Sequence, residues 1–397
     1  MPAAHKTTTV IEPRRTILVF QGGGALGAYQ AGVFEALVES GRQPDWVVGT
    51  SIGAINGALI AGNPPEYRLA RLREFWHLMS KGVGGLDVWE ALFGATLRNL
   101  ATLTFGVPGF FAPRSFPSFA FNLPAAPGLA SFYSVELLAK TLAELVDFDY
   151  LAQSPVRLSV GAVDVESAQL VYFDSKQETL QPAHILASGA LPPAFPTVEI
   201  GGRYYWDGGI YSNTSLDWIL HDQPRDHSLC IFPTLWPQQD QAPRALGDVL
   251  RREKEIQFAS RADTIIEMER EMHRMRHAIN LLARALAEHD KDSPLIPLAC
   301  MGCGSVFHVI HLEAPRLPKE DQTKDIEFAP ARVGQRWAAG RADAGRALAA
   351  KPWMIEVPPT EGVMVHDFSR PSVVAARQAL PQGPACAPPR ARKSATR

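Results

Sequence analysis

The sequence has few of the features that mark a secreted, membrane-spanning or nucleic-acid-binding protein. Four cysteines in 397 residues are too few for a disulfide framework. No run of about 18 uninterrupted apolar residues is present, so no segment is expected to span a membrane. Residues 1–15 lack the apolar core of a secretory signal. The net charge of -2 predicts no general affinity for nucleic acid or anionic surfaces. These absences favour a cytoplasmic protein.

The composition is that of an ordinary globular protein. Apolar residues make up 46% of the chain and charged residues 20%, and the chain is long enough to bury a sizeable core. Cys300 and Cys303 form a C-x-x-C pair, but no second pair or ligand cluster accompanies it. We therefore expect no metal site there.

Two βα units open the chain. The apolar run 16–20 predicts a buried strand, which leads into the glycine-rich loop 21–27 and then a helix to about residue 40. A second apolar run, 46–48, leads into Gly-Thr-Ser-Ile-Gly and another helix. This order predicts a parallel, right-handed α/β sheet with both glycine loops at its carboxyl edge.

The second loop matches the G-x-S-x-G turn known as a nucleophile elbow. Gly49 and Gly53 flank Ser51 between an expected strand and an expected helix, which is the context that lifts a serine hydroxyl above a sheet. The alternative is a tight turn in which Ser51 only caps the helix. The motif is short and common, so it does not decide between these interpretations.

The first loop satisfies G-x-G-x-x-G through Gly22, Gly24 and Gly27. A dinucleotide site would also need an acidic residue at the end of the second strand, where this chain has Gly-Thr-Ser, and no G-K-[ST] follows for a phosphate loop. The alternative is chemical, because glycine N–H groups at a helix N-terminus can stabilise an oxyanion. Beside a serine elbow, Gly22, Gly23 and Gly24 are therefore candidates for an oxyanion hole.

The segment 81–132 differs in composition from its surroundings. It mixes Gly, Pro, Phe and Leu, and is too rich in proline for regular strands and too apolar for a solvated loop. One interpretation is a loop packed on the core. The other is a flap that lines an acyl-chain pocket or dips into lipid.

Together with Asp207-Gly208-Gly209, the two glycine loops resemble the patatin-like phospholipase family, in that order along the chain. Segments 187–193 and 209–214 also resemble its bacterial members. The resemblance covers about residues 16–220, and the later part resembles an extension seen in some bacterial members. It implies a patatin-like, three-layer α/β/α fold with a mainly parallel central sheet.

The resemblance also implies a Ser–Asp dyad that needs no metal or cofactor. Ser51 would be the nucleophile and Asp207 the base, although an Asp before Gly is most often a turn former. The oxyanion hole would use the amides of Gly22, Gly23, Gly24 and Ile52. The supporting motif residues are Gly27, Gly49, Gly53, Gly208 and Gly209.

A histidine-dependent triad is the rival arrangement, because an α/β-hydrolase places its histidine downstream of the serine and the acid. None of the downstream histidines lies in a recognisable catalytic loop. They are His221, His227, His308, His311 and His366.

We expect four regions along the chain. These are a flexible tail (1–15), a catalytic domain (16–235) that includes the apolar flap or lid (81–132), a mostly helical C-terminal extension packed on the core (236–370), and a disordered tail rich in Pro, Ala and Arg (371–397).

The resulting hypothesis is a cytoplasmic serine lipid acyl hydrolase of the phospholipase A or lysophospholipase type. Its partners would be a lipid or ester substrate and a peripheral membrane surface, with no nucleic acid. Two alternatives stay open: a carboxylesterase acting on soluble or storage esters, and a lipid-binding or regulatory protein with a vestigial site.

Overall fold

The computed structural model describes residues 9–81, 102, 104–114, 126–259, 262–318 and 320–369. The expected C-terminal tail and most of the expected flap lie outside these residues. Within the expected N-terminal tail, β1 (Thr9–Val10) pairs with β12 (Glu356–Val357), which corrects the prediction of a flexible segment at these two positions.

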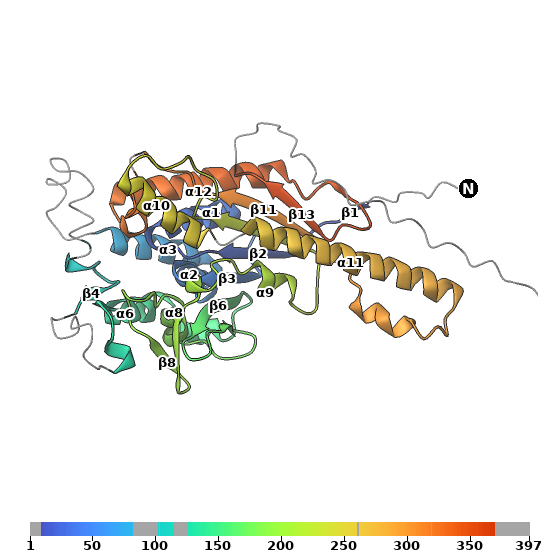
Figure 1. The fold of residues 1–397 in the computed structure, drawn as a ribbon, viewed down its shortest axis with the longest axis horizontal. Coiled ribbons are helices and arrows are strands. Elements are labelled where there is room, and N and C mark those ends of the chain that lie inside the picture. Colours follow the sequence, from blue (N-terminus) through green and yellow to red (C-terminus); the bar gives the residue numbers. More distant parts are fainter. Residues whose placement is uncertain are drawn as a thin grey trace, which may run out of the picture.

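A nine-stranded sheet forms the centre of the molecule (Figure 1). Six neighbouring strands are parallel, and at one side β7 and β9 pair antiparallel with β6 and β8 pairs antiparallel with β9. In spatial order the strands are β13 (Val363–Asp367), β11 (Phe307–Glu313), β10 (Ser228–Thr234), β2 (Arg15–Phe20), β3 (Trp46–Thr50), β6 (Arg157–Asp164), β9 (Arg203–Asp207) and β8 (Val198–Ile200), with β7 (Leu170–Asp174) also paired to β6.

Both faces of the sheet are buried, as a parallel sheet requires. Along β2, Leu18 and Phe20 pack into the core cluster on one face, whereas Ile17 and Val19 pack into the cluster on the other. The apolar run 16–20 is continuous because the strand has no solvent-facing side.

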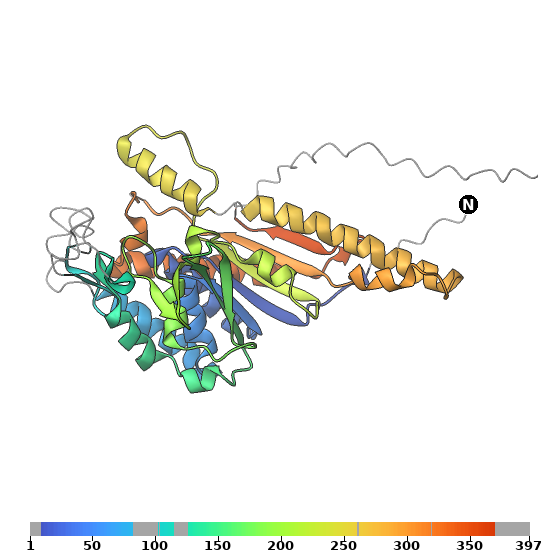
Figure 2. The same cartoon turned by 60° about the horizontal axis from the view of Figure 1, so that its bottom comes forward.

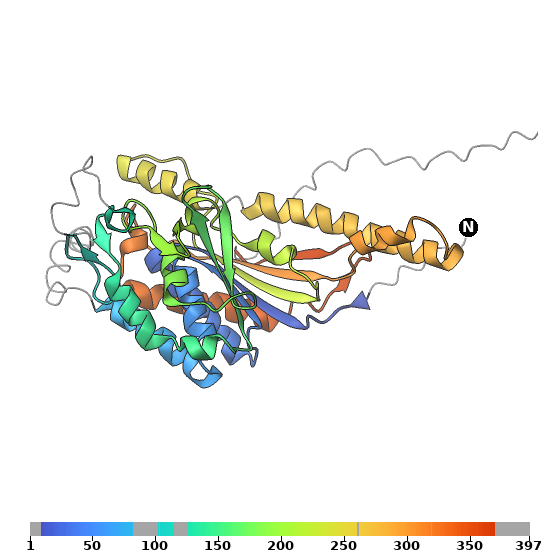
Figure 3. The same ribbon diagram turned by 90° about the horizontal axis from the view of Figure 1, so that it is seen from below.

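Helices cover both faces of the sheet, as Figures 2 and 3 show. One core cluster receives side chains from α1 (Ala28–Glu39), α2 (Ile52–Ala61), α3 (Pro65–Ser80), α6 (Glu136–Leu145), α8 (Pro182–Ser188) and α12 (Pro330–Ala350). The opposite cluster receives side chains from α9 (Leu216–Leu220) and α11 (Ala262–His289). The predicted three-layer α/β/α fold with a mainly parallel sheet is confirmed.

Shorter elements surround this core. The strands β4 (Ala112–Pro113) and β5 (Tyr133–Ser134) form a separate pair, and α7 (Phe148–Leu151) follows α6. The helix α10 (Leu246–Phe258) precedes α11. The 3-10 turns are η1 (Gly24–Gly27), η3 (Pro127–Leu129), η4 (Gly208–Ile210), η5 (Ile296–Met301) and η6 (Lys324–Ile326).

The region after residue 235 is mostly helical, but it also completes the sheet with β11 and β13. Its helix α12 lies against α1, where Trp337 donates its indole N–H to Glu35 and Arg341 pairs with Glu39. The expected division at residue 235 stays a prediction. Among the helices described, none is both long and apolar enough to cross a bilayer.

Candidate active site

Strand β6 brings Ser51 and Asp207 together. Thr50, the last residue of β3, pairs with Gly161, and Asp207, the last residue of β9, pairs with Ala162. These are consecutive positions on β6. Two residues that lie far apart in the sequence therefore meet at one point of the sheet edge.

Ser51 occupies a strained turn between β3 and α2. Its backbone has φ 57° and ψ -123°, a backbone conformation that residues other than glycine rarely adopt. A Cβ at Gly49 would lie 2.4 Å from the carbonyl oxygen of Gly53, and a Cβ at Gly53 would lie 2.3 Å from that of Phe20. Only glycine fits at both positions. The Ser51 side chain makes no capping hydrogen bond to α2, so the interpretation of Ser51 as a helix cap is wrong.

Asp207 is buried and its carboxyl group faces Ser51. Its Oδ1 accepts the N–H of Gly209 at 2.7 Å, so Asp207 does form the expected turn, and the Ser51 side chain lies close enough to lower the pKa of the carboxyl group. Burial raises the pKa of Asp207 to about 7, and the hydrogen bond from Gly209 and the nearby Ser51 side chain offset this rise only in part. The carboxyl group therefore titrates near neutral pH.

The glycine loop is held by two side chains, Asn213 and Trp236, from the segments that follow β9 and β10. The N–H of Gly22 donates to Oδ1 of Asn213 at 2.7 Å, and the carbonyl oxygen of Gly22 accepts from Asn213 Nδ2 at 3.0 Å and Trp236 Nε1 at 2.8 Å. The prediction that Gly22 is an oxyanion donor is therefore wrong, because its N–H already donates to Asn213. Within the described part of the chain, the N–H groups of Gly23, Gly24 and Ile52 donate to no acceptor.

Ser188 links the elbow to β6. The N–H of Ser51 donates to Ser188 Oγ at 3.1 Å, and this hydroxyl donates to the carbonyl oxygen of Gly161 at 2.6 Å. Ser188 and Asn213 lie in segments 187–193 and 209–214, which resemble the family, but no sequence pattern predicts the contacts that they make.

A cavity of about 380 Å³ opens beside Ser51, Asp207 and the glycine loop. Its walls are largely apolar and aromatic. Phe110 contacts Phe195 and Phe328, with ring centroids 6.1 and 6.0 Å apart, and Tyr133 contacts Phe111 at 4.8 Å. Phe110 and Phe111 belong to the expected flap. These two side chains therefore both pack on the core and line the cavity.

Residues 18–217 match the profile of the patatin-like phospholipase family, which is just over half of the chain. This chain belongs to that family. Residues 256–360 match a second profile, described as patatin phospholipase. The family resemblance found in the sequence is confirmed.

Individual relatives of this patatin-like chain are similar to it over shorter stretches. It is 32% identical over 200 residues to patatin-like phospholipase domain-containing protein 7 of Mus musculus, which is 50% of this chain and 12% of that protein. It is 49% identical over 57 residues to lysophospholipase nte1 of Aspergillus terreus, 14% of this chain and 4% of that protein. A crystal structure of VipD from Legionella pneumophila is 15% identical with a TM-score of 0.41, covering 86% of this chain and 68% of that chain. The chain thus spans a small part of these curated relatives.

In this patatin-like chain, residues of the C-terminal region pack against the glycine loop. A Cβ at Gly24 would lie 2.2 Å from the carbonyl oxygen of Asp325, so η6 packs directly on the loop. The Asp325 carboxylate pairs with Lys254 of α10 at 2.6 Å, and both side chains line the cavity. The active-site cavity is thus built partly from residues outside the first matched segment.

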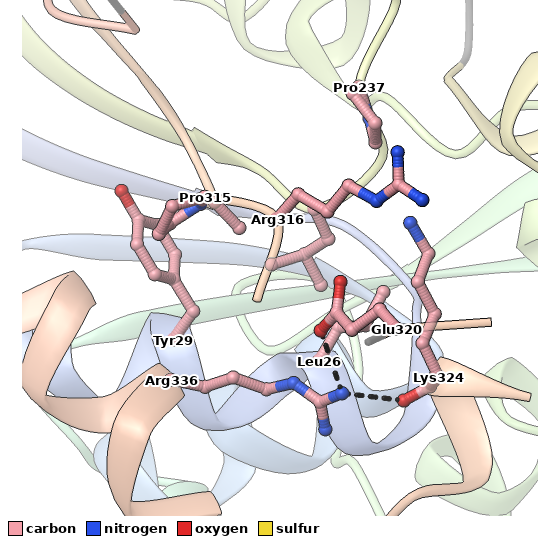
Figure 4. A pocket seen from close by; sticks show the side chains of 10 residues that line it. Leu26, Tyr29, Pro237, Pro315, Arg316, Glu320, Lys324 and Arg336 are labelled. Atoms are coloured by element: carbon pink, nitrogen blue, oxygen red, sulfur yellow. Dashed lines mark hydrogen bonds and ion pairs between the residues drawn. The ribbon is translucent and has the colours of Figure 1, made fainter. Parts of the chain in front are cut away.

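A charged network fixes η6 on its other side. Figure 4 shows Arg336 of α12, which donates to Glu320 Oε1 at 3.1 Å and to the carbonyl oxygen of Lys324 at 2.9 Å, close to Leu26 of the glycine loop. The ammonium group of Lys324 binds Glu255 of α10 at 2.8 Å. These buried ion pairs join α10, η6 and α12 around the loop.

The five downstream histidines considered for a triad contact residues that do not line the cavity. His308 and His366 stack on neighbouring strands, with His308 Nδ1 3.0 Å from His366 Nε2. His227 Nδ1 accepts the N–H of Val306, and His311 contacts Thr234, while His221 contacts the carbonyl oxygen of Asp217. Among the described residues that line the cavity, none is a histidine. Likewise, no cluster of three or more potential metal-binding side chains occurs in the described ranges.

Proposed function

We propose that this chain is a serine lipid acyl hydrolase of the phospholipase A or lysophospholipase type that works through a Ser51–Asp207 dyad. The observation that carries the proposal is the meeting of Ser51 with a buried Asp207 at consecutive positions of β6, where both line one apolar cavity and the pKa of Asp207 is raised to about 7. A perturbed carboxyl group beside a strained serine is an arrangement typical of catalytic sites.

In the first step Asp207 takes the Ser51 proton as Oγ attacks the acyl carbon of the ester. A serine hydroxyl is a weak nucleophile without such a base, and a base with a pKa near the working pH is the most effective. The new Oγ–C bond makes the acyl carbon tetrahedral and moves the carbonyl electron pair onto oxygen.

The oxyanion would be stabilised by the N–H groups of Gly23, Gly24 and Ile52, which are free in the described structure. Removing one such donor typically costs about 3–4 kcal/mol of transition-state stabilisation. Gly22 has a different function in this proposal. Its bonds to Asn213 and Trp236 hold the loop so that the next two amides can point at the reacting oxygen.

Collapse of the tetrahedral species breaks the ester bond, and protonated Asp207 returns its proton to the leaving alcohol or lysolipid. Asp207 then takes a proton from water, whose oxygen attacks the acyl-enzyme, and the acid leaves as Ser51 regains its proton. The apolar cavity suits a fatty acyl chain, because burying its methylene groups contributes about 0.8 kcal/mol each. No step needs a metal or cofactor.

The names of two relatives agree with this substrate class, since one is called a lysophospholipase and the other a patatin-like phospholipase domain-containing protein. The aromatic lining of the cavity favours a long acyl chain over a short soluble ester. We therefore place lipid hydrolysis ahead of a general carboxylesterase activity.

The test is hydrolysis of a panel of phospholipids, lysophospholipids and short soluble esters by wild type, Ser51→Ala and Asp207→Asn. We expect wild type to release fatty acid and to react covalently with a fluorophosphonate at Ser51, while both variants lose turnover by at least about a hundredfold. A folded Asp207→Asn variant that retains wild-type turnover would refute the dyad. A wild-type protein that neither turns over any ester nor labels would refute the enzyme and favour a lipid-binding protein.

A further inference from the structure

The helix α10 has two faces of different character. On one face Arg251 and Glu255 are buried, and Arg251 pairs with Asp240 at 2.6 Å and with Glu255 at 2.7 Å. The opposite face carries large apolar side chains exposed to solvent. They are Leu246 (76% exposed), Val249 (46%), Leu250 (48%) and Ile256 (63%).

The spacing of these residues places them on one side of the helix. Positions three, four and ten residues after Leu246 fall on the same face at 3.6 residues per turn. Single exposed leucines are common in soluble proteins, but four large apolar side chains exposed on one side of a helix mark an interaction surface. We call Leu246, Val249, Leu250 and Ile256 the α10 face.

The α10 face lies on a helix that also lines the cavity beside Ser51 and Asp207. Lys254 and Phe258 of the same helix line that cavity, and the carbonyl oxygen of Phe258 accepts from Asn213 at 3.1 Å. Immediately after the catalytic loop, Ile210 and Tyr211 are exposed as well. In Figures 2 and 3 α10, drawn in yellow, stands away from the sheet.

We propose that the α10 face docks on a phospholipid bilayer, so that the mouth of the cavity opens against the lipid that supplies the acyl chain. This inference rests on the proposed function, because it is the apolar cavity next to this face that identifies a lipid surface as the occupant. A helix with a polar, anchored face and an apolar outer face is the usual form of an interfacial helix. An acyl chain leaving the bilayer would then pass from one apolar environment to another.

The position of Glu253 sets the depth of docking. This exposed carboxylate lies on the same side of α10 as Leu246 and Leu250, within the outer face. An ionised carboxylate is costly to move out of water, so insertion is shallow and concentrated on the first turns of α10. Replacing Glu253 with Gln should therefore strengthen docking.

A matched control is available at the other end of the molecule. Leu282, on α11, is 70% exposed, close to the value for Leu246. Figure 1 places α10 and the far end of α11 at opposite ends of the structure. A charge at Leu282 alters surface hydrophobicity as much as a charge at Leu246 and leaves the α10 face intact.

The experiment measures co-sedimentation with vesicles of phosphatidylcholine, which carry no net charge. The Ser51→Ala protein is used so that binding is read without hydrolysis. We expect Leu246→Glu to reduce the bound fraction and Leu246→Glu/Leu250→Glu to reduce it at least about fivefold, whereas the matched single variant Leu282→Glu should leave it unchanged. Glu253→Gln should raise it. Failure of the Ser51→Ala protein to bind, or an equal loss in the Leu282→Glu control, would overturn the proposal.

Two further measurements separate loss of lipid docking from loss of catalysis and from loss of a contact between two copies of the chain. In protein with Ser51 intact, Leu246→Glu/Leu250→Glu should hydrolyse a short soluble ester at the wild-type rate and lose activity only on vesicles. If no variant or wild type hydrolyses any ester while vesicle binding still depends on Leu246 and Leu250, the proposed function fails and the docking surface stands. A drop from dimer to monomer by light scattering in this variant, with vesicle binding unchanged, would assign the face to a second copy of the chain and refute docking on lipid.

Discussion

Replacing Asp207 with Asn should stabilise the fold at alkaline pH while it removes catalysis. Asp207 is buried, and its pKa is raised to about 7 mainly by that burial. A carboxyl group with a raised pKa favours the folded state only when protonated. Its contribution to stability is complete below the unfolded pKa and is lost as the pH rises through the folded pKa. Asn has nearly the same shape, and it can still accept from Gly209 without ever carrying a charge.

The size of the effect follows from the two pKa values. With an ordinary Asp pKa of about 3.9 and a folded value of about 7, ionisation of Asp207 costs about 4 kcal/mol once the pH exceeds 7. Between about pH 5 and about pH 8 the same relation predicts a change of about 2–3 kcal/mol. The advantage of Asp207→Asn over wild type should widen by that amount over this interval.

The measurement is urea unfolding of both proteins at several pH values, with hydrolysis of a short soluble ester followed in parallel. Wild-type kcat/KM should rise with pH through about 7 and then level off, because only ionised Asp207 can take the Ser51 proton. The variant should lose turnover by about a hundredfold to ten-thousandfold at every pH.

A control of opposite sign comes from Asp164. Hydrogen bonds, the largest from the backbone N–H of Ser167, lower the pKa of Asp164 despite its burial. Asp164→Asn should therefore lose stability relative to wild type as the pH rises through the acidic range. If Asp207→Asn shows a pH-independent stability difference, or resembles Asp164→Asn in sign, the assignment of a raised pKa to Asp207 is refuted.

Three other substitutions test the architecture around the dyad. Asn213→Ala leaves the N–H of Gly22 without its acceptor, so kcat on a soluble ester should fall about tenfold or more with KM nearly unchanged; a pure KM effect would contradict the positioning of the loop. Gly24→Ala should lower both turnover and the melting temperature, because its Cβ would lie 2.2 Å from the carbonyl oxygen of Asp325 and its φ is +53°; calorimetry that shows no loss would contradict this packing. Phe110→Ala should raise KM about tenfold for long-chain esters and much less for short-chain ones, and an equal change for both would contradict an acyl site.

The local parts of the catalytic site could be predicted from the sequence. Ser51 and its flanking glycines form a contiguous strand–turn–helix motif whose geometry follows from sterics. Asp207 was a different case, because its neighbours indicate only a turn. Its assignment as base came from a family resemblance, and the structure adds the contact with Ser51.

The parts that could not be predicted depend on contacts distant in sequence. The prediction that Gly22 is an oxyanion donor was wrong because Asn213, 191 residues further along the chain, takes its N–H. The indole of Trp236 is equally remote from the loop that it holds. No local pattern indicates that β11, in the extension expected to be mostly helical, joins the same sheet next to β10.

Strand β6 has a consequence for how such an enzyme can vary. Because Gly161 pairs with Thr50 of β3 and Ala162 pairs with Asp207 of β9, strand pairing alone keeps the proposed nucleophile and base in register, with no direct contribution from residues 104–114. The chain between β3 and β6 supplies Phe110, Phe111 and Tyr133, which form much of the acyl wall. Under the proposed function, substitutions of these wall residues would alter which acyl chains fit without changing the strand pairing that sets Ser51 and Asp207, so substrate preference and chemistry could evolve separately.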